Sequence, residues 1–243
     1  RGGSPQRPSF LPVGAFTLIG HRGAPIFAEE NTVDSFQRAF ASNLKGVELD
    51  VQLSSDNKLI IYHDFHIVSS AGIYHEIKST TYEELKELKS GELPQLQDAL
   101  DCIPAEGFAN IEIKSDQMLN TRIVKRVLTE INKRKIQHKC IVSSFNPFVI
   151  WRMKRLDSHI CTAFLWTEDN SFSILNSPLW VWFCRPDGFH GDIRNLDKSL
   201  VTWLRKKGFY ILGYTVNSPL HLAKARSLNL DGIFSDDPYI IKH

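Results

Sequence analysis

Side chains that commonly perform chemistry stand beside short apolar runs in this 243-residue sequence. The set comprises His21, Arg22, Glu48, Asp50, His63, Glu112 and Lys114. Glu48 and Asp50 are two residues apart, so in a strand they share one face. The same spacing separates Glu112 from Lys114. If the runs are parallel strands, these groups gather at one end of a sheet.

The carboxylates of this set predict a metal site. Glu48, Asp50 and Glu112 would repel one another strongly in a low dielectric. A hard divalent cation removes that repulsion, and Mg²⁺ or Ca²⁺ suits oxygen ligands. Arg22 and Lys114 add positive charge, which indicates an anionic substrate, most simply a phosphate ester.

The two histidines predict proton transfer. His21 and His63 could serve as general acid and general base near neutral pH. Each feature also has a structural explanation, since a lone histidine at a strand end or a Glu-x-Asp pair is usually an ordinary surface feature. The functional interpretation is favoured because four separate segments supply compatible groups.

The elements that must position these groups alternate between strands and helices. Helices are expected after Asn31 as N-cap and over about 82–89, 96–102, 117–133, 147–156, 197–207 and 219–228. Nine strands are expected, over 16–20, 47–53, 59–63, 109–114, 140–145, 160–165, 187–190, 210–216 and 232–235. This alternation predicts βαβ units and a parallel sheet. Eight units fit a TIM (β/α)8 barrel, in the α/β class.

The ninth strand is explained by a hairpin. Only a short polar turn separates strands 47–53 and 59–63, too little for a parallel crossover. Centring the turn on Ser55 and Asp56 pairs residues whose numbers sum to 111, which brings His63 opposite Glu48. A slip of one or two residues in this register would still return His63 to the neighbourhood of Glu48. We expect a small insertion over about 64–108 after the His63-Asp64 hairpin. A doubly wound sheet is the alternative fold, but no GxGxxG follows the first strand.

Composition limits the remaining possibilities. There are 29 Lys and Arg against 27 Asp and Glu, so no basic excess favours nucleic acid. No apolar run reaches the roughly 18 residues of a membrane helix, and stable membrane insertion is not expected. Residues 1–14 are interpreted as a flexible lead-in and 15–243 as one domain. Four widely spaced cysteines favour free thiols and a cytoplasmic location.

The motifs of this chain, in their order and spacing along the sequence, resemble those of the glycerophosphodiester phosphodiesterase family, especially its short cytoplasmic bacterial enzymes. They are His21-Arg22-Gly23, Glu30-Asn31-Thr32, Glu48-Leu49-Asp50-Val51, His63-Asp64, Leu93-Pro94-Gln95-Leu96, Glu112-Ile113-Lys114, Tyr214-Thr215-Val216-Asn217 and Asp231-Gly232-Ile233-Phe234-Ser235-Asp236. The chain departs from the family pattern in three places. Glu29 stands where the family usually has proline, and Tyr214 replaces the usual tryptophan. The run Phe65-His66-Ile67-Val68 stands where the family often has a run of the Arg-Thr-Thr type.

The resemblance implies a TIM barrel and one bound Mg²⁺ or Ca²⁺ on Glu48, Asp50 and Glu112. It implies that His21 and His63 are the acid/base pair, with Arg22, Lys114 and Asn217 as phosphate or substrate contacts. The expected reaction is metal-dependent hydrolysis of glycerophosphodiesters to an alcohol and sn-glycerol 3-phosphate, through attack by the neighbouring glycerol hydroxyl. Asp64 is expected to position His63, and His66 and His190 are additional candidates near the rim.

Three alternatives to this function stay open at the level of sequence. A related barrel phosphodiesterase would act on lysophospholipids or phosphoinositides. A glycoside hydrolase would use rim carboxylates without a metal. A non-catalytic barrel would only bind phosphate. The sequence identifies no protein partner or oligomeric state.

Overall fold

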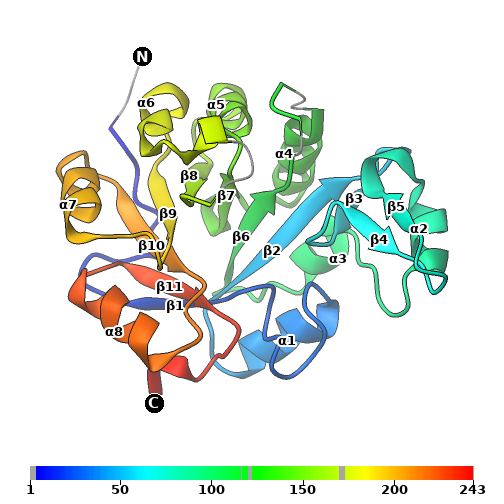
Figure 1. Cartoon of the computed structure of the whole chain (residues 1–243), viewed down its shortest axis with the longest axis horizontal. Helices are drawn as coiled ribbons and strands as arrows, with labels where there is room; N and C mark the ends of the chain where they lie inside the picture. The colour runs from blue at the N-terminus through cyan, green and yellow to red at the C-terminus, as the bar shows by residue number, and fades with distance from the viewer. Residues whose placement is uncertain (1–3, 116, 120–121, 170–172, 243) are drawn as a thin grey trace.

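The structure, a computed structural model, describes residues 4–115, 117–119, 122–169 and 173–242 (Figure 1). Eight parallel strands close into a barrel through pairing of the first with both the second and the last. They are β1 (Thr17–Gly20), β2 (Gly46–Leu53), β6 (Phe108–Ile113), β7 (Cys140–Ser144), β8 (Cys161–Trp166), β9 (Gly188–Asp192), β10 (Tyr210–Tyr214) and β11 (Gly232–Ser235). The predicted TIM barrel is confirmed.

Helices surround the barrel (Figure 1). They are α1 (Val33–Ala41), α3 (Leu96–Asp101), α4 (Arg122–Arg134), α5 (Pro147–Leu156), α6 (Val181–Cys184), α7 (Lys198–Lys206) and α8 (Pro219–Ser227). Two expectations were wrong. The N-cap of α1 is Thr32, whose side chain accepts a hydrogen bond from the Ser35 amide, and not Asn31. The helix expected from residue 117 begins at Arg122; residues 117–119 lie outside it, and 116, 120 and 121 lie outside the described residues.

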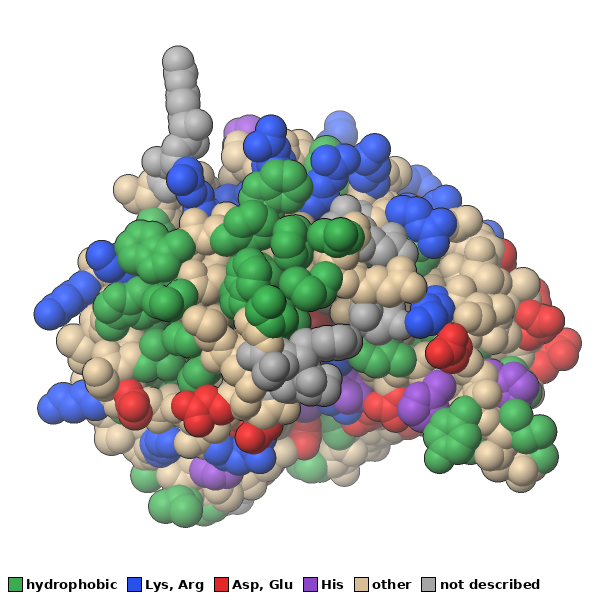
Figure 2. All heavy atoms as spheres, turned by 45° about the horizontal axis from the view of Figure 1, so that its top comes forward, with side chains coloured by type: hydrophobic (Ala, Val, Ile, Leu, Met, Phe, Trp, Pro, Cys, Tyr) green, Lys and Arg blue, Asp and Glu red, His purple; other side chains and the backbone are tan. Residues whose placement is uncertain are grey.

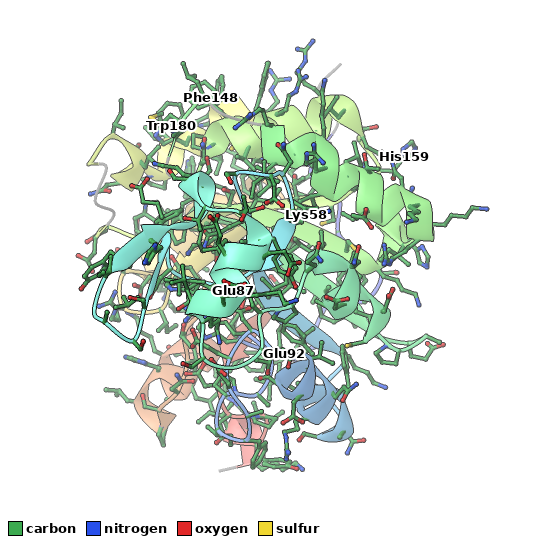
Figure 3. The ribbon with its side chains drawn as sticks, turned by 90° about the vertical axis from the view of Figure 1, so that its right-hand side faces the viewer. Lys58, Glu87, Glu92, Phe148, His159 and Trp180 are labelled. Atoms are coloured by element: carbon green, nitrogen blue, oxygen red, sulfur yellow. The ribbon has the colours of Figure 1, made fainter. Side chains whose placement is uncertain are left out.

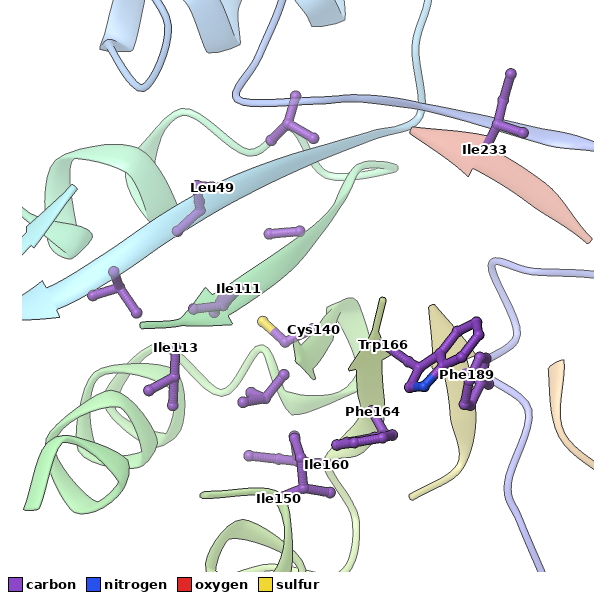
Figure 4. Packing of buried hydrophobic residues seen from close by; sticks show 14 of the residues in the cluster. Leu49, Ile111, Ile113, Cys140, Ile150, Ile160, Phe164, Trp166, Phe189 and Ile233 are labelled. Carbon is purple, nitrogen blue, oxygen red and sulfur yellow. The ribbon is translucent and has the colours of Figure 1, made fainter. Parts of the chain in front are cut away.

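The hydrophobic core has two layers. The larger layer lies between sheet and helices and includes Leu49, Ile111 and Phe164 (Figure 4). The smaller layer includes Ile19 and Phe108. Its residues alternate along each strand with those of the larger layer and point into the barrel, as expected for a barrel interior. Alternate strand positions therefore serve the two layers, which leaves the carboxyl ends of the strands free for polar groups.

The predicted antiparallel hairpin is confirmed, and its register lies one residue from the one centred on Ser55 and Asp56, within the expected slip of one or two residues. Strand β3 (Leu59–Ile61) pairs antiparallel to β2 with Val51 opposite Ile61, so paired numbers sum to 112. Beyond the last strand pair, the Ser54 amide donates to the Lys58 carbonyl at 3.0 Å, so the turn between these two residues contains three residues. The last of them, Asn57, has a φ of 63°. Such a loop centres on Asp56 rather than between Ser55 and Asp56. Because β3 ends at Ile61, His63 lies beyond this strand and is not paired with Glu48.

The connection from β3 to β6 contains elements of its own. A small hairpin of β4 (His66–Val68) and β5 (Tyr74–Glu76), which the sequence analysis did not predict, precedes α2 (Tyr82–Leu88). Ile67 of β4 and Leu85 of α2 share a small apolar cluster with Ile60. By contrast, the buried residues of α3 belong to the main core. Among the described residues, no helix is long and apolar enough to cross a bilayer.

Candidate active site

Three carboxylates meet at the carboxyl end of the barrel. Glu48 and Asp50 come from β2 and Glu112 from the adjacent strand β6, where Asp50 and Glu112 are register partners. One oxygen of each lies within 4.8 Å of the others. Glu48 and Asp50 are almost completely buried. The structure thus brings together the three acidic residues that the sequence selects.

Glu48 is the least compensated of these carboxylates. Its Oε2 accepts a hydrogen bond from the Arg22 amide at 2.8 Å, but its buried Oε1 has no hydrogen-bond partner among the described residues. Burial, and then repulsion from Asp50 and Glu112, raises the pKa of Glu48 well above its usual value. A positive charge beside Oε1 would relieve both penalties.

Asp50 has the opposite electrostatic environment. Burial alone would raise its pKa, but Lys114, Arg22 and His63 together lower it below the usual value. Its Oδ2 accepts a hydrogen bond from Asn31 Nδ2 at 2.9 Å and lies 3.3 Å from Arg22 Nε. Asp50 is therefore held as a carboxylate.

Lys114 adds a second cation to the cluster. Its Nζ lies 3.1 Å from Glu112 Oε1 and 3.7 Å from Asp50 Oδ1. Although burial opposes its charge, Glu112 and Asp50 raise its pKa overall. Among the described residues, Glu48 Oε1 and Glu112 Oε1 are both buried without a hydrogen bond, and only Glu112 Oε1 has an ion-pair partner, Lys114. Three such oxygen donors fit a hard divalent cation, and the two side-chain cations fit a phosphate beside it.

The loop after β1 presents His21 and Arg22 because its backbone makes a sharp turn. Arg22 and Gly23 have φ values of 54° and 94°. A Cβ on Gly23 would lie 2.3–2.8 Å from atoms of Ser35, so only glycine fits there. Ser35 Oγ accepts a hydrogen bond from the Ala24 amide and donates one to the Arg22 carbonyl. Helix α1 thus holds the turn in place.

His21 is oriented by the far end of the chain. Its Nδ1 lies 2.7 Å from Asp236 Oδ1, just after β11. Asn217 Nδ2 donates to Asp236 Oδ2 at 2.5 Å, and Asn217 Oδ1 accepts from the Asp236 amide at 2.9 Å. Burial would raise the pKa of Asp236, but the bond to His21 and its other partners lower it. Asn217 therefore holds Asp236; a direct contact between Asn217 and substrate stays a prediction.

His63 is oriented by its neighbour and by a buried amide. Its Nδ1 lies 2.7 Å from Asp64 Oδ1, the contact expected of a positioning carboxylate. Gln52 Nε2 donates to the Tyr62 and Asp64 carbonyls at 2.7 and 2.6 Å, which fixes the backbone on both sides of His63. His63 is also close enough to Asp50 to lower the pKa of that carboxyl.

Three supporting residues were not identified from the sequence: Asn31, Gln52 and Asp236. Asn31 and Asp236 lie inside the family motifs, but the sequence did not predict that they contact residues of the site. Gln52 continues the two-residue spacing of Glu48 and Asp50, a signal that was available. His190 was expected near the rim, but it is completely buried against Tyr210 and Phe234.

Comparisons with known proteins agree with this geometry. The sequence profile of the glycerophosphoryl diester phosphodiesterase family matches residues 21–240. A glycerophosphodiester phosphodiesterase of Caldanaerobacter subterraneus is 29% identical, with 91% of this chain and 94% of the relative covered. A structure of the Thermotoga maritima glycerophosphodiester phosphodiesterase is 29% identical with a TM-score of 0.77, covering 95% and 99% of the two chains. An Oleispira antarctica phosphodiesterase, solved in complex with the product sn-glycerol-3-phosphate, is 25% identical with a TM-score of 0.79 and 96% coverage of each.

Proposed function

Because this chain belongs to the glycerophosphoryl diester phosphodiesterase family, we propose that it hydrolyses glycerophosphodiesters to an alcohol and sn-glycerol 3-phosphate. The observation that carries this proposal is the arrangement at the barrel mouth. Three clustered carboxylates lie beside two cations, and two histidines each have a carboxylate partner on Nδ1. The product complex of the Oleispira antarctica phosphodiesterase supports the same chemistry.

Glu48, Asp50 and Glu112 would hold one Mg²⁺ or Ca²⁺. When bound, the ion would polarise a non-bridging phosphate oxygen as a Lewis acid. Arg22 and Lys114 would neutralise the charge of the phosphate. These two cations already compensate Asp50, so they orient the diester without a large reorganisation of the site.

His21 and His63 would transfer the protons. The glycerol hydroxyl next to the diester attacks phosphorus and loses its proton to one histidine. The bond from phosphorus to the alcohol oxygen breaks, and the other histidine protonates that oxygen. Water then opens the cyclic phosphate to sn-glycerol 3-phosphate. Intramolecular attack benefits from the proximity of the hydroxyl.

The test is release of glycerol 3-phosphate from glycerophosphocholine, glycerophosphoethanolamine and glycerophosphoglycerol, before metal removal, after it, and after return of Mg²⁺, Ca²⁺ or Mn²⁺. We expect release that depends on metal. His21→Ala and His63→Ala should each lower the rate by roughly two to four decades. His159→Ala is the matched control, because His159 is 90% exposed (Figure 3). A loss of only a few-fold in either active-site variant would contradict the acid/base assignment.

A cytoplasmic location is part of this proposal. The support is that Cys102, Cys140, Cys161 and Cys184 are all free thiols. Proteins exposed to oxidising compartments more often carry disulfides.

A further inference from the structure

An aromatic cluster lies on the outer surface of α5, α6 and the short 3₁₀ helix η4 (Pro178–Trp180), and the catalytic site does not use it. We call it the aromatic face and define it as Phe148, Trp151, Ile174, Leu179, Trp180, Trp182 and Phe183. Figure 2 shows a gathering of hydrophobic side chains, with Lys and Arg along one border. Phe148 lies close to Trp180 (Figure 3), with ring centroids 6.2 Å apart, and 4.9 Å from Phe183.

The aromatic face is open to solvent. Ile174, Leu179 and Trp182 are 57–60% exposed, unlike the buried side chains of the core. Four of the five tryptophans in the chain belong to this face or contact it, since Trp203 on α7 lies 6.2 Å from Trp182. Contiguous exposed apolar surface of this kind usually marks an interaction site.

Cations border the aromatic face. The Arg155 guanidinium lies 5.2 Å from the Trp151 ring, and Lys207 Nζ lies 4.9 Å from the Trp182 ring. Among the described residues, no carboxylate forms an ion pair with Arg152, Arg155, Lys206 or Lys207. The wider region is also basic: residues 122–207 contain 16 Lys and Arg against 7 Asp and Glu, whereas residues 1–121 contain 10 against 17.

The chemistry of this face points to one occupant: we propose that it docks reversibly on an anionic phospholipid bilayer. Tryptophan favours the membrane–water interface, and basic residues near it are attracted to anionic lipid. A symmetric dimer through this face would place its border cations near the same cations of a second copy, which opposes that arrangement. A bilayer carries the complementary charge.

Docking would place the barrel mouth beside the lipid surface. Ile174 and Leu179 belong to the loop that leaves the carboxyl end of β8, the end at which the catalytic residues lie. Trp166, the last residue of β8, ties this loop to the barrel, because its Nε1 donates to the Asn176 carbonyl at 2.8 Å and its own carbonyl accepts from Tyr214 Oη at 2.9 Å. The enzyme would then work where phospholipid breakdown releases its substrates.

The test is co-sedimentation of the full chain with vesicles of phosphatidylcholine alone and of equal parts phosphatidylcholine and phosphatidylglycerol. We expect binding to the anionic vesicles that weakens in high salt. The double variant Leu179→Ala, Trp182→Ala should bind at least about tenfold more weakly, because it removes apolar area that docking buries. The matched control is Leu220→Ala on α8, which is 77% exposed and lies on another side of the barrel. Lys206→Glu, Lys207→Glu should also lose binding to anionic vesicles.

Three results would overturn the proposal. The first is no binding to anionic vesicles, and the second is equal binding by the double variant. The third is a dimer in solution that the double variant abolishes, which would identify a second copy as the occupant. All variants should hydrolyse water-soluble glycerophosphocholine at the wild-type rate, so loss of docking is distinguishable from failure of the proposed catalytic function.

Discussion

Glu48 and Asp50 show how one strand can create two different carboxylates. Both are buried, but Asp50 lies near Arg22, Lys114 and His63, which lower its pKa. Glu48 keeps one oxygen without a hydrogen bond, and its pKa rises. This inequality is typical of sites whose charge is completed by a ligand.

Asp236→Asn tests whether the orientation of His21 matters for catalysis. The variant keeps the size of the side chain but removes the charged acceptor of the His21 Nδ1 contact. We expect kcat to fall by about one to two decades with little change in KM, as for other residues that orient a reacting group. Steady-state kinetics on glycerophosphocholine gives both values.

Asp237→Asn is the matched control for this experiment. Asp237 is the next residue and is similarly half-buried, but its Oδ1 accepts a hydrogen bond from the Tyr239 amide instead. Near-wild-type kcat for Asp237→Asn with a large loss for Asp236→Asn would support the positioning role. A loss confined to KM in Asp236→Asn would contradict it.

The main groups of the site could be predicted from local spacing, but their supports could not. Glu48 and Asp50 share a face because strand side chains alternate. The partner of His21 is 215 residues away, so nothing local indicates that Asp236 meets it. Asn31 has the side chain of an N-cap, yet its positive φ directs it to Asp50 while Thr32 caps the helix.

At the scale of elements, turn geometry decides where the proposed catalytic groups lie. The three-residue turn of the β2–β3 hairpin sets a register one residue away from the predicted one. Because β3 ends at Ile61, His63 lies outside the ladder, and Gln52 holds the backbone on both sides of it. Period-two patterning predicts strands well, but it does not distinguish turns that differ by one residue.

The β1–α1 turn permits a comparison of two glycine substitutions. Gly23 and Gly72 both have positive φ, at 94° and 77°. Alanine at either position costs about 1 kcal/mol in backbone strain. Only at Gly23 does the new Cβ also meet Ser35, and nothing lies within 4 Å at Gly72. We expect Gly23→Ala to lower the free energy of unfolding by at least about 2 kcal/mol more than Gly72→Ala.

Urea unfolding followed by tryptophan fluorescence measures this difference. Gly72→Ala should keep full activity, because the β4–β5 tip has room for a methyl group. Gly23→Ala should lose activity even where it is folded, since the turn carries His21 and Arg22. Equal destabilisation by the two substitutions would show that Ser35 moves away from the new methyl group without lowering the free energy of unfolding.

At the scale of the whole molecule, the alternation of strands and helices was sufficient to predict the barrel. Eight strand–helix units and a hairpin accounted for all nine predicted strands, and each is present. The short β4–β5 hairpin was missed because its strands contain three residues each, too few to show a period. The charge division between residues 1–121 and 122–207 was hidden by the net charge of +2.

The barrel interior makes overall stability dependent on pH through His190. Burial lowers the pKa of this histidine to about 3, whereas an unfolded histidine has a pKa of about 6.5. Its contribution to stability is therefore complete above pH 6.5 and is lost as the pH falls toward 3. Between pH 7.5 and pH 5 the linkage predicts a loss of about 2 kcal/mol.

His190→Gln isolates this contribution, because carboxylates also titrate in acid. The free energy of unfolding of wild type and variant should be measured in urea at both pH values. We expect the variant to lose about 2 kcal/mol less than wild type over this interval. The same loss in both proteins would mean that His190 binds a proton in the folded state.

The bond between His21 and Asp236 also has a consequence during protein synthesis. Glu48, Asp50 and Glu112 are all made within the first half of the chain, so a growing polypeptide carries every proposed metal ligand early. The carboxylate that orients His21 is made only after β11, the strand that completes the barrel. Domains of this kind fold as units, so catalysis should begin only when translation has passed residue 236. An unfinished chain on the ribosome would carry the proposed metal ligands but leave phosphodiesters intact.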